Sequence, residues 1–439
     1  MLLEFSVANF RSVAERQTFS MVAGTGAARN MSLSLDTGIA LAPRALRSAC
    51  LFGPNASGKT SLVRALGFME RFVRQSSSKQ TEGDTIDVTP FLLNAALKES
   101  PSEFEVLFIH GGNFYQYGFS ADRFRVHHEW LFFRSGQAGS RTRSVFYREY
   151  NSEIDDYEWQ TNDTLLRGER ELWKSSTRSN ALFLSTAVQL NAECLKEPFD
   201  WFRYYLRVIE SPERLHPNTT AKLVAKPDGK ETVLSFLQSV DLKVDDVSVE
   251  QREFVLNERI TELFSASFID SLQKVGKEVK DYRVRLKHTG GDGTSADFEL
   301  EDESDGTRVL FSLAGPLADT LTNGYTVVVD ELHNSLHPMA LRHIVGMFHD
   351  DRTNMKKAQI IFTSHETSVL AKDFMHRDQV WLVEKSKGNA TRLVPLSDFK
   401  VRELDAFQKN YLAGKYGALP RLKGWSLEQR AGAGSSGQS

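Results

Sequence analysis

The sequence predicts an α/β protein built around a phosphate-binding loop, and three observations lead to this fold class. The motif GPNASGKT, residues 53–60, lies between a short apolar strand and an amphipathic helix. A second apolar strand, TVVVDE at 326–331, ends in two adjacent carboxylates. Strand-like runs at 103–110, 114–120, 126–133 and 144–150 predict an antiparallel sheet subdomain.

The composition is that of an ordinary globular protein. The 439 residues are 41% hydrophobic and 25% charged, with a formal net charge of −3, so nucleic-acid contacts would need a local basic patch. Cys50 and Cys194 are the only cysteines, which argues against disulfide frameworks and zinc sites. Without a secretory leader or an apolar run of membrane-spanning length, we expect a soluble, cytoplasmic protein with no membrane partner.

The first elements follow from periodicity. LLEFSVANF, residues 2–10, alternates in polarity as a half-buried edge strand does. Residues 60–75 place apolar side chains on one helical stripe, and the glycine turn at 111–112 joins two strands. We therefore assign residues 1–164 to an N-terminal lobe that carries the phosphate loop and the antiparallel subdomain.

The phosphate loop fits the pattern G-x-x-x-x-G-K-[ST] in the strand–loop–helix context that the pattern requires. Its glycines let backbone N–H groups turn toward phosphate oxygens, while the lysine reaches the β- and γ-phosphates and the threonine suits Mg²⁺. The alternative is a glycine-rich turn with an accidental lysine. The residues predicted to bind the nucleotide here are Gly53, Asn55, Ser57, Gly58, Lys59, Thr60 and Ser61.

The character of the chain changes after residue 164. The runs at 181–210 and 231–240 have helix-like apolar spacing without sustained heptads, so residues 165–281 are predicted to form a mainly helical insertion that carries a partner or dimer surface. Strands return in a C-terminal lobe over 282–400. A helical segment at 401–425 and a disordered tail at 426–439 follow.

Asp330 and Glu331 are the predicted hydrolytic carboxylates. In phosphoryl transfer the first acid at a strand end holds Mg²⁺, and a second orients or deprotonates the attacking water. The alternative is a solvated Asp-Glu pair that simply ends the strand. His333 and His337 have i,i+4 spacing, but the neighbouring Pro338 favours a loop over a metal-binding helix.

The turn Ser304-Asp305-Gly306 precedes apolar residues at helical spacing from Val309 to Leu321, and Gly324 is a plausible end of that helix. Taken alone, the turn predicts a helix N-cap and nothing more.

The order of these motifs resembles that of ATP-binding-cassette (ABC) ATPases: GPNASGKT, SDGT, VVVDE, NSLHP and IIFTSH. The resemblance implies that Ser304 and Gly306 contact the γ-phosphate bound to a second copy, and that residues 334–337 form the subunit-interface loop, with Asn334 at the nucleotide. It also implies a switch histidine at His365, where a surface histidine is the alternative. Ala56 replaces a glycine usual in the family, SDGT differs from the transporter sequence LSGGQ, and no glutamine-loop residue is assigned.

The opening NFRSV is similar to that of RecF, SMC and OLD ATPases, in which an arginine at the place of Arg11 lies near the phosphates. PFLLN (90–94), DQVWLVEK (378–385) and YLAGKYGALP (411–420) resemble stand-alone OLD-like ATPases of bacterial antiphage systems, including the PARIS type. The implied fold is a P-loop NTPase of the ABC type, as in SMC, RecF and OLD heads, with a mixed-sheet core.

The function implied by the resemblance is that of an ATPase, with ATP and Mg²⁺ as cofactors, that pairs or assembles further around ATP. It would control a separate effector such as a TOPRIM nuclease, with a phage protein as trigger, because the chain ends about seventy residues after His365, too few for a further domain. The rivals are a RecF-like repair ATPase that binds DNA, for which the basic stretch 134–144 is a candidate contact, and a slow ATP-locked scaffold.

Overall fold

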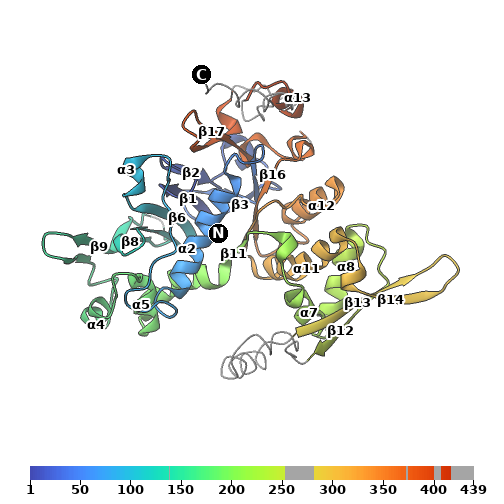
Figure 1. Cartoon of the computed structure of the whole chain (residues 1–439), viewed down its shortest axis with the longest axis horizontal. Coiled ribbons are helices and arrows are strands. Elements are labelled where there is room, and N and C mark those ends of the chain that lie inside the picture. Colours follow the sequence, from blue (N-terminus) through green and yellow to red (C-terminus); the bar gives the residue numbers. More distant parts are fainter. Residues whose placement is uncertain (138, 253–280, 372–373, 400–406, 417–439) are drawn as a thin grey trace, which may run out of the picture.

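The computed structural model describes residues 1–137, 139–252, 281–371, 374–399 and 407–416. Two sheets and the long helix α2 (Lys59–Gln75) between them form its centre (Figure 1). No helix of the described residues combines the length and the apolar character that a membrane crossing needs. The C-terminal segment predicted at 401–425 is described only as far as helix α13 (Phe407–Leu412) and the turn after it, and the tail 426–439 lies outside the described residues.

The seven-stranded sheet is antiparallel, with the order β10-β9-β8-β7-β6-β1-β2. Its strands are β1 (Leu2–Ala8), β2 (Gln17–Ser20), β6 (Ser102–His110), β7 (Asn113–Ala121), β8 (Val126–Arg134), β9 (Arg143–Asn151) and β10 (Asp156–Thr161). The predicted antiparallel subdomain is thus confirmed. The prediction of an edge position for β1 was wrong, because β1 lies between β6 and β2 and is buried at most of its positions.

The six-stranded sheet has the order β11-β15-β16-β5-β17-β18 and is parallel except for β18. Its strands are β5 (Ser48–Phe52), β11 (Leu206–Ile209), β15 (Thr326–Val329), β16 (Gln359–Ser364), β17 (Val380–Lys385) and β18 (Thr391–Pro395). The helix-like interpretation of 181–210 fails for β11. Its residues pair in parallel with β15, and this pairing overrides the local spacing.

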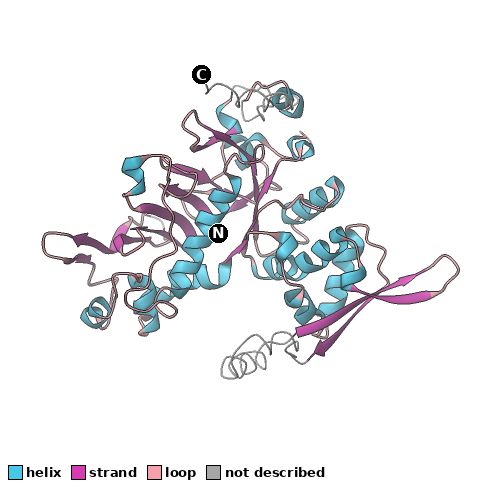
Figure 2. Cartoon of the chain, viewed as in Figure 1, coloured by secondary structure: helices cyan, strands magenta, loops and turns pink. Residues whose placement is uncertain are grey.

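Both faces of the parallel sheet are covered, as the continuous apolar strands require. On β5, Leu51 belongs to the core shared with α2 and the antiparallel sheet, whereas Cys50 and Phe52 belong to the core beneath α11 and α12. On its other side α2 packs aromatic rings against the antiparallel sheet, with 5.4 Å between the ring centroids of Phe72 and Phe119. Helix α2 is therefore the shared layer between the two sheets (Figure 2).

The remaining elements surround these layers. A three-stranded sheet, β12 (Asp246–Arg252), β13 (Asp281–Thr289) and β14 (Ser295–Glu299), projects beside helices α7 and α8 (Figure 1), and β3 (Ser34–Asp36) pairs with β4 (Arg44–Leu46). The helices are α1 (Thr25–Ala28), α3 (Ala95–Lys98), α4 (Arg170–Ser175), α5 (Phe183–Gln189), α6 (Glu193–Asp200), α7 (Asn218–Val224), α8 (Gly229–Ser239), α11 (Asp305–Asn323) and α12 (Pro338–His349). A π-helical turn, η1 (Trp201–Tyr205), leads from α6 into β11.

The predicted start and end of α11 are confirmed. The Ser304 side chain accepts a hydrogen bond from the Thr307 N–H at 3.2 Å, as an N-cap does, and Gly324 ends the helix in a left-handed conformation.

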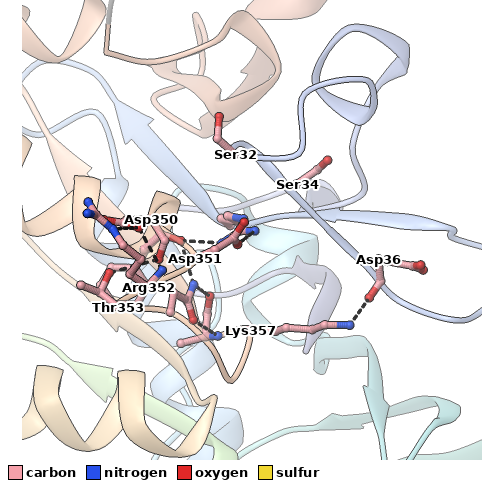
Figure 3. A network of polar contacts seen from close by, with 12 residues as sticks. Ser32, Ser34, Asp36, Asp350, Asp351, Arg352, Thr353 and Lys357 are labelled. Carbon is pink, nitrogen blue, oxygen red and sulfur yellow. Dashed lines mark hydrogen bonds and ion pairs between the residues drawn. The ribbon is translucent and has the colours of Figure 1, made fainter.

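Polar contacts fasten the loop after α12 to the β3–β4 hairpin (Figure 3). Lys357 Nζ donates to the Asp36 carbonyl at 3.0 Å, and Arg352 pairs with Asp350 at 2.8 Å. Arg47, which precedes β5, pairs with Asp351 in the same loop. The end of α12 is thereby held at the amino-terminal edge of the parallel sheet.

A fully buried ion pair joins the antiparallel sheet to α5. The carboxylate of Glu129 (β8) accepts from Arg148 Nε at 2.9 Å, from the Tyr117 hydroxyl at 2.9 Å, and from the N–H groups of Phe183 and Leu184 at 2.7 and 3.0 Å. The side chains of Glu129 and Arg148 are both 0% exposed.

Because of this network, Glu129→Ala should lower the free energy of unfolding by about 3–5 kcal/mol, since it leaves the Arg148 guanidinium buried without its partner. Thermal denaturation followed by circular dichroism measures the effect. Glu149→Ala, on the neighbouring strand β9 with a side chain 49% exposed, is the control and should change stability by less than about 0.5 kcal/mol. Equal melting temperatures for the two variants would show that the ion pair does not stabilise the fold.

Candidate functional site

The phosphate loop connects β5 to α2 in a strained conformation suited to an anion. Gly58 has φ 111°, and a Cβ there would lie 1.9 Å from Thr391 Oγ1, so only glycine fits. Ala56 has φ 61°, a left-handed conformation that costs a non-glycine residue about 1–2 kcal/mol. Successive left- and right-handed residues turn backbone N–H groups into one concavity. Ser57 lies within it, and its buried Oγ has no hydrogen-bond partner among the described residues.

Lys59 begins helix α2 and is almost entirely buried. Its ammonium donates to the carbonyls of Gly53 at 2.7 Å and Pro54 at 3.1 Å, which holds the side chain back over the loop. Burial lowers the pKa of Lys59, and the nearby carboxylates of Glu331 and Asp330 oppose that shift. The amine is thus held, with two acids nearby, at the place where phosphate oxygens would bind.

Asp330 and Glu331 follow β15 directly. Asp330 is only 3% exposed, and burial raises the pKa of its carboxyl, while hydrogen bonds from the Thr363 and Thr60 hydroxyls act in the opposite direction. Thr363 Oγ1 donates to Asp330 Oδ1 at 2.6 Å and accepts from the Glu331 N–H at 2.7 Å. Glu331 itself has φ 50°, so this hydroxyl stabilises a strained backbone as well as a buried carboxylate.

These residues fit a magnesium ion bound together with a nucleotide. Thr60 and Asp330 bring oxygen ligands to the same point, and Mg²⁺ takes its remaining ligands from phosphates and water. In the described part of the chain, no cluster of three or more His, Cys, Asp or Glu residues forms a separate metal cage. When bound, the ion would supply positive charge to the phosphates, and Asp330 would hold it.

His365 follows β16 and contacts His333, for which the sequence predicted only a loop position. His333 Nε2 lies 3.0 Å from His365 Nδ1, and the two rings meet edge to face. Burial and the neighbouring His365 lower the pKa of His333 to about 4, so His333 is neutral at physiological pH. Its ring therefore constrains the orientation of His365 without adding charge.

A single cavity of about 430 Å³ brings most of the predicted residues together. It is lined by the loop residues from Asn55 to Ser61, by Glu331, Asn334 and His365, and also by Ser12 and Lys385. Ser12 and Lys385 were not predicted. Ser12 follows Arg11 in the NFRSV stretch, so the sequence does contain a signal for it. No local pattern identifies Lys385 or Thr363.

Five predicted residues do not line the cavity. Gly53 and Asp330 are buried next to residues that do line it. Arg11 is exposed, with its guanidinium 5.5 Å from the Phe10 ring, and does not line the cavity. Ser304 and Gly306 also lie outside it. Gly306 packs against the loop 334–337 so closely that a Cβ there would be 2.8 Å from the Ser335 carbonyl oxygen. The turn at 304–306 and the loop at 334–337 therefore form one continuous surface beside the cavity.

The sequence and the fold can be compared with those of known proteins. Residues 48–371, well over half of the chain, match the sequence profile of the family AAA_21, described as "AAA domain, putative AbiEii toxin, Type IV TA system". No curated protein matches the sequence. The sheet order confirms the predicted α/β fold with a mixed-sheet core and an antiparallel subdomain, and the family match shows an AAA domain.

Among solved structures, the chain is similar to an SMC head bound to the C-winged helix domain of ScpA, at 10% identity and a TM-score of 0.43, over 90% of this chain and 96% of that one. It is also similar to the recombination mediator protein RecF with ATP, at 12% identity and a TM-score of 0.33, over 90% and 97% of the two chains. The ATPrS form of RecF gives 11% identity and a TM-score of 0.30 over 90% and 98%.

The role of the Thr363 hydroxyl is open to a direct test. Thr363→Val keeps the shape but removes the donor to Asp330 and the acceptor for the Glu331 N–H. Hydrogen bonds to charged groups contribute about 1.5–3 kcal/mol, so Mg²⁺-dependent ATP hydrolysis should fall about tenfold to a hundredfold. Thr363→Ser retains the hydroxyl and should stay within a few-fold of the wild type. A valine variant as active as the serine variant would contradict this role.

Proposed function

This chain belongs to the AAA_21 family, and from that membership and its cavity we propose an ATPase in which two copies associate around bound ATP and hydrolysis releases them. The observation that carries the proposal is the division of the site. One copy brings the phosphate loop, Glu331, Asn334 and His365 into one cavity, but it leaves Ser304 and Gly306 outside. A second copy facing the cavity would bring these two residues to it.

The surface that would meet the second copy is exposed and mostly polar. Ser304, Asp305, Ser335 and His337 are exposed, and Met339, just beyond the loop, is 64% exposed. The α11 N-terminus presents N–H groups and the positive end of its dipole, as an anion-binding helix start does. An ATP γ-phosphate bound to one copy is the chemical group that such a surface would recognise on the other.

Each residue has a role in this proposal. Lys59 and the loop N–H groups bind the phosphates, while Thr60 and Asp330 hold Mg²⁺. Glu331 accepts the proton of the attacking water, and His365 contacts the γ-phosphate. The Asn334 side chain donates to Glu331 Oε2 at 2.7 Å, which orients that carboxylate.

We further propose that the ATP-dependent assembly controls a separate toxic effector in bacterial antiphage defence. The family description names a toxin and a toxin–antitoxin system, which supports a link between this chain and a toxic effector. The resemblance to stand-alone OLD-like ATPases suggests that the separate effector is a nuclease such as a TOPRIM protein. A phage protein would act by changing the balance between the two assembly states. The rival is direct action on DNA, which predicts DNA-stimulated hydrolysis that weakens steeply with salt.

Glu331→Gln tests the assembly. The amide keeps the size of the side chain but cannot accept the proton, so ATP should persist and hold two copies together. With saturating Mg-ATP, light scattering after gel filtration should give about twice the mass of the nucleotide-free protein. Adding Lys59→Ala to the same chain should return it to the lower mass. A Glu331→Gln chain of unchanged mass that nevertheless binds ATP would overturn the proposed association.

The division of the site between copies has its own test. Ser304→Asp preserves an N-cap acceptor but places a negative charge toward the phosphate of the other copy. Alone, this variant and Lys59→Ala should each be inactive, because every pair carries a defect at both sites. Mixed in equal amounts they should recover measurable ATP hydrolysis, since a mixed pair has one intact site. No recovery after subunit exchange, shown by pull-down of differently tagged chains, would place Ser304 outside the partner's site.

A further inference from the structure

Lys385 lines the nucleotide cavity from the side opposite the catalytic carboxylates. In the parallel sheet, β16 and β17 flank β5 on its two edges. β16 carries Thr363 and leads into His365, whereas Lys385 is the last residue of β17. The cavity therefore has a hydrolytic end, formed by Glu331, Asn334 and His365, and another end that the mechanism above does not use.

The Lys385 ammonium has no carboxylate partner among the described residues. Its one described hydrogen bond goes to Thr391 Oγ1, at a long 3.4 Å. Burial lowers its pKa, and no neighbouring acid opposes the shift, in contrast to Lys59. A partly buried cation without a counter-ion is costly unless an anion binds beside it.

Hydroxyl groups place Lys385 relative to the phosphate loop. Thr391 Oγ1 is 2.8 Å from Ser12 Oγ, and Ser12 Oγ donates to Ser61 Oγ at 2.8 Å. Thr391 Oγ1 also donates to the Ser57 carbonyl at 3.1 Å. These contacts fix Lys385 beside the loop and the first turn of α2. The N–H groups there cradle the α- and β-phosphates, while Glu331 and His365 define the γ-phosphate end.

From this arrangement we infer that Lys385 is a second lysine of the nucleotide site and that its ammonium binds the α-phosphate. The inference rests on the proposed function, because it needs a nucleotide in the cavity. The two lysines then bind different groups. Lys59 binds the β- and γ-phosphates, whereas Lys385 binds the α-phosphate, which ATP and ADP share. Loss of the Lys385 side chain should therefore weaken the binding of ATP and the binding of ADP by the same factor.

Isothermal titration of the full chain with Mg-ADP and with a non-hydrolysable ATP analogue measures this effect. Lys385→Ala should bind both about tenfold or more weakly, since a charge-assisted hydrogen bond is lost. Lys385→Arg keeps a cation and should recover most of the affinity. Lys387→Ala removes an exposed lysine from the turn after β17 and should bind like the wild type. Melting temperatures without nucleotide check that all variants are folded.

The outcomes separate the inference from the proposed function. If neither the wild type nor Lys387→Ala binds nucleotide, both fail. If those two bind and Lys385→Ala binds equally well, or loses only the ATP analogue, the inference alone fails. Titration with 2′,3′-dideoxy-ADP distinguishes phosphate from ribose. An α-phosphate contact predicts the same loss on Lys385→Ala, whereas disappearance of the loss would assign Lys385 to the ribose hydroxyls and overturn the phosphate contact.

Discussion

The site depends on one constraint: two adjacent carboxylates must be stabilised and correctly oriented at the end of a buried strand. Burial raises the pKa of Asp330, and the chain must turn sharply to bring Glu331 into the cavity. A single hydroxyl meets both needs, because Thr363 Oγ1 donates to Asp330 and accepts from the Glu331 N–H. The parallel register that pairs Val329 with Phe362 places Thr363 beside Asp330, so strand pairing sets the chemistry of the site.

The same sheet explains how residues more than three hundred positions apart in sequence form one cavity. Parallel strands end at one edge, and β15, β16, β5 and β17 deliver Glu331, His365, Lys59 and Lys385 there in spatial order. Helix α2 starts at that edge and packs its aromatic side on the antiparallel sheet, with 5.0 Å between the ring centroids of Phe68 and Phe104. A shift of either sheet against α2 would therefore displace the phosphate loop.

Sequence patterns predicted the features that depend on neighbouring residues and missed those that depend on tertiary contacts. The phosphate loop, the Ser304 N-cap and the strand ending in Asp330 each depend on neighbours in the chain, so motif and spacing were sufficient. β11 was missed because its four residues follow helices without a break, and only pairing with β15 makes them a strand. β1 was placed at an edge because its alternation does not show that β2 covers its outer side. Thr363, His333 and Lys385 belong to the site through contacts across the sheet, which no local pattern encodes.

One end of the cavity would be completed by the partner subunit, whereas the other end is formed by a single chain. This difference determines the order of steps in the proposed cycle. At the end proposed for the γ-phosphate, Glu331 and His365 lie next to the exposed loop at 334–337, where Ser304 of the partner subunit would enter. At the other end, Ser12, Ser61 and Lys385 all belong to one chain. In the proposed cycle, hydrolysis would remove the group that joins the two copies but leave the α-phosphate contacts intact. The copies should then separate while each retains ADP, and the interface loop stays uncovered until ADP is exchanged for ATP. The release of ADP, and not bond cleavage, would set how long an effector meets the uncovered surface.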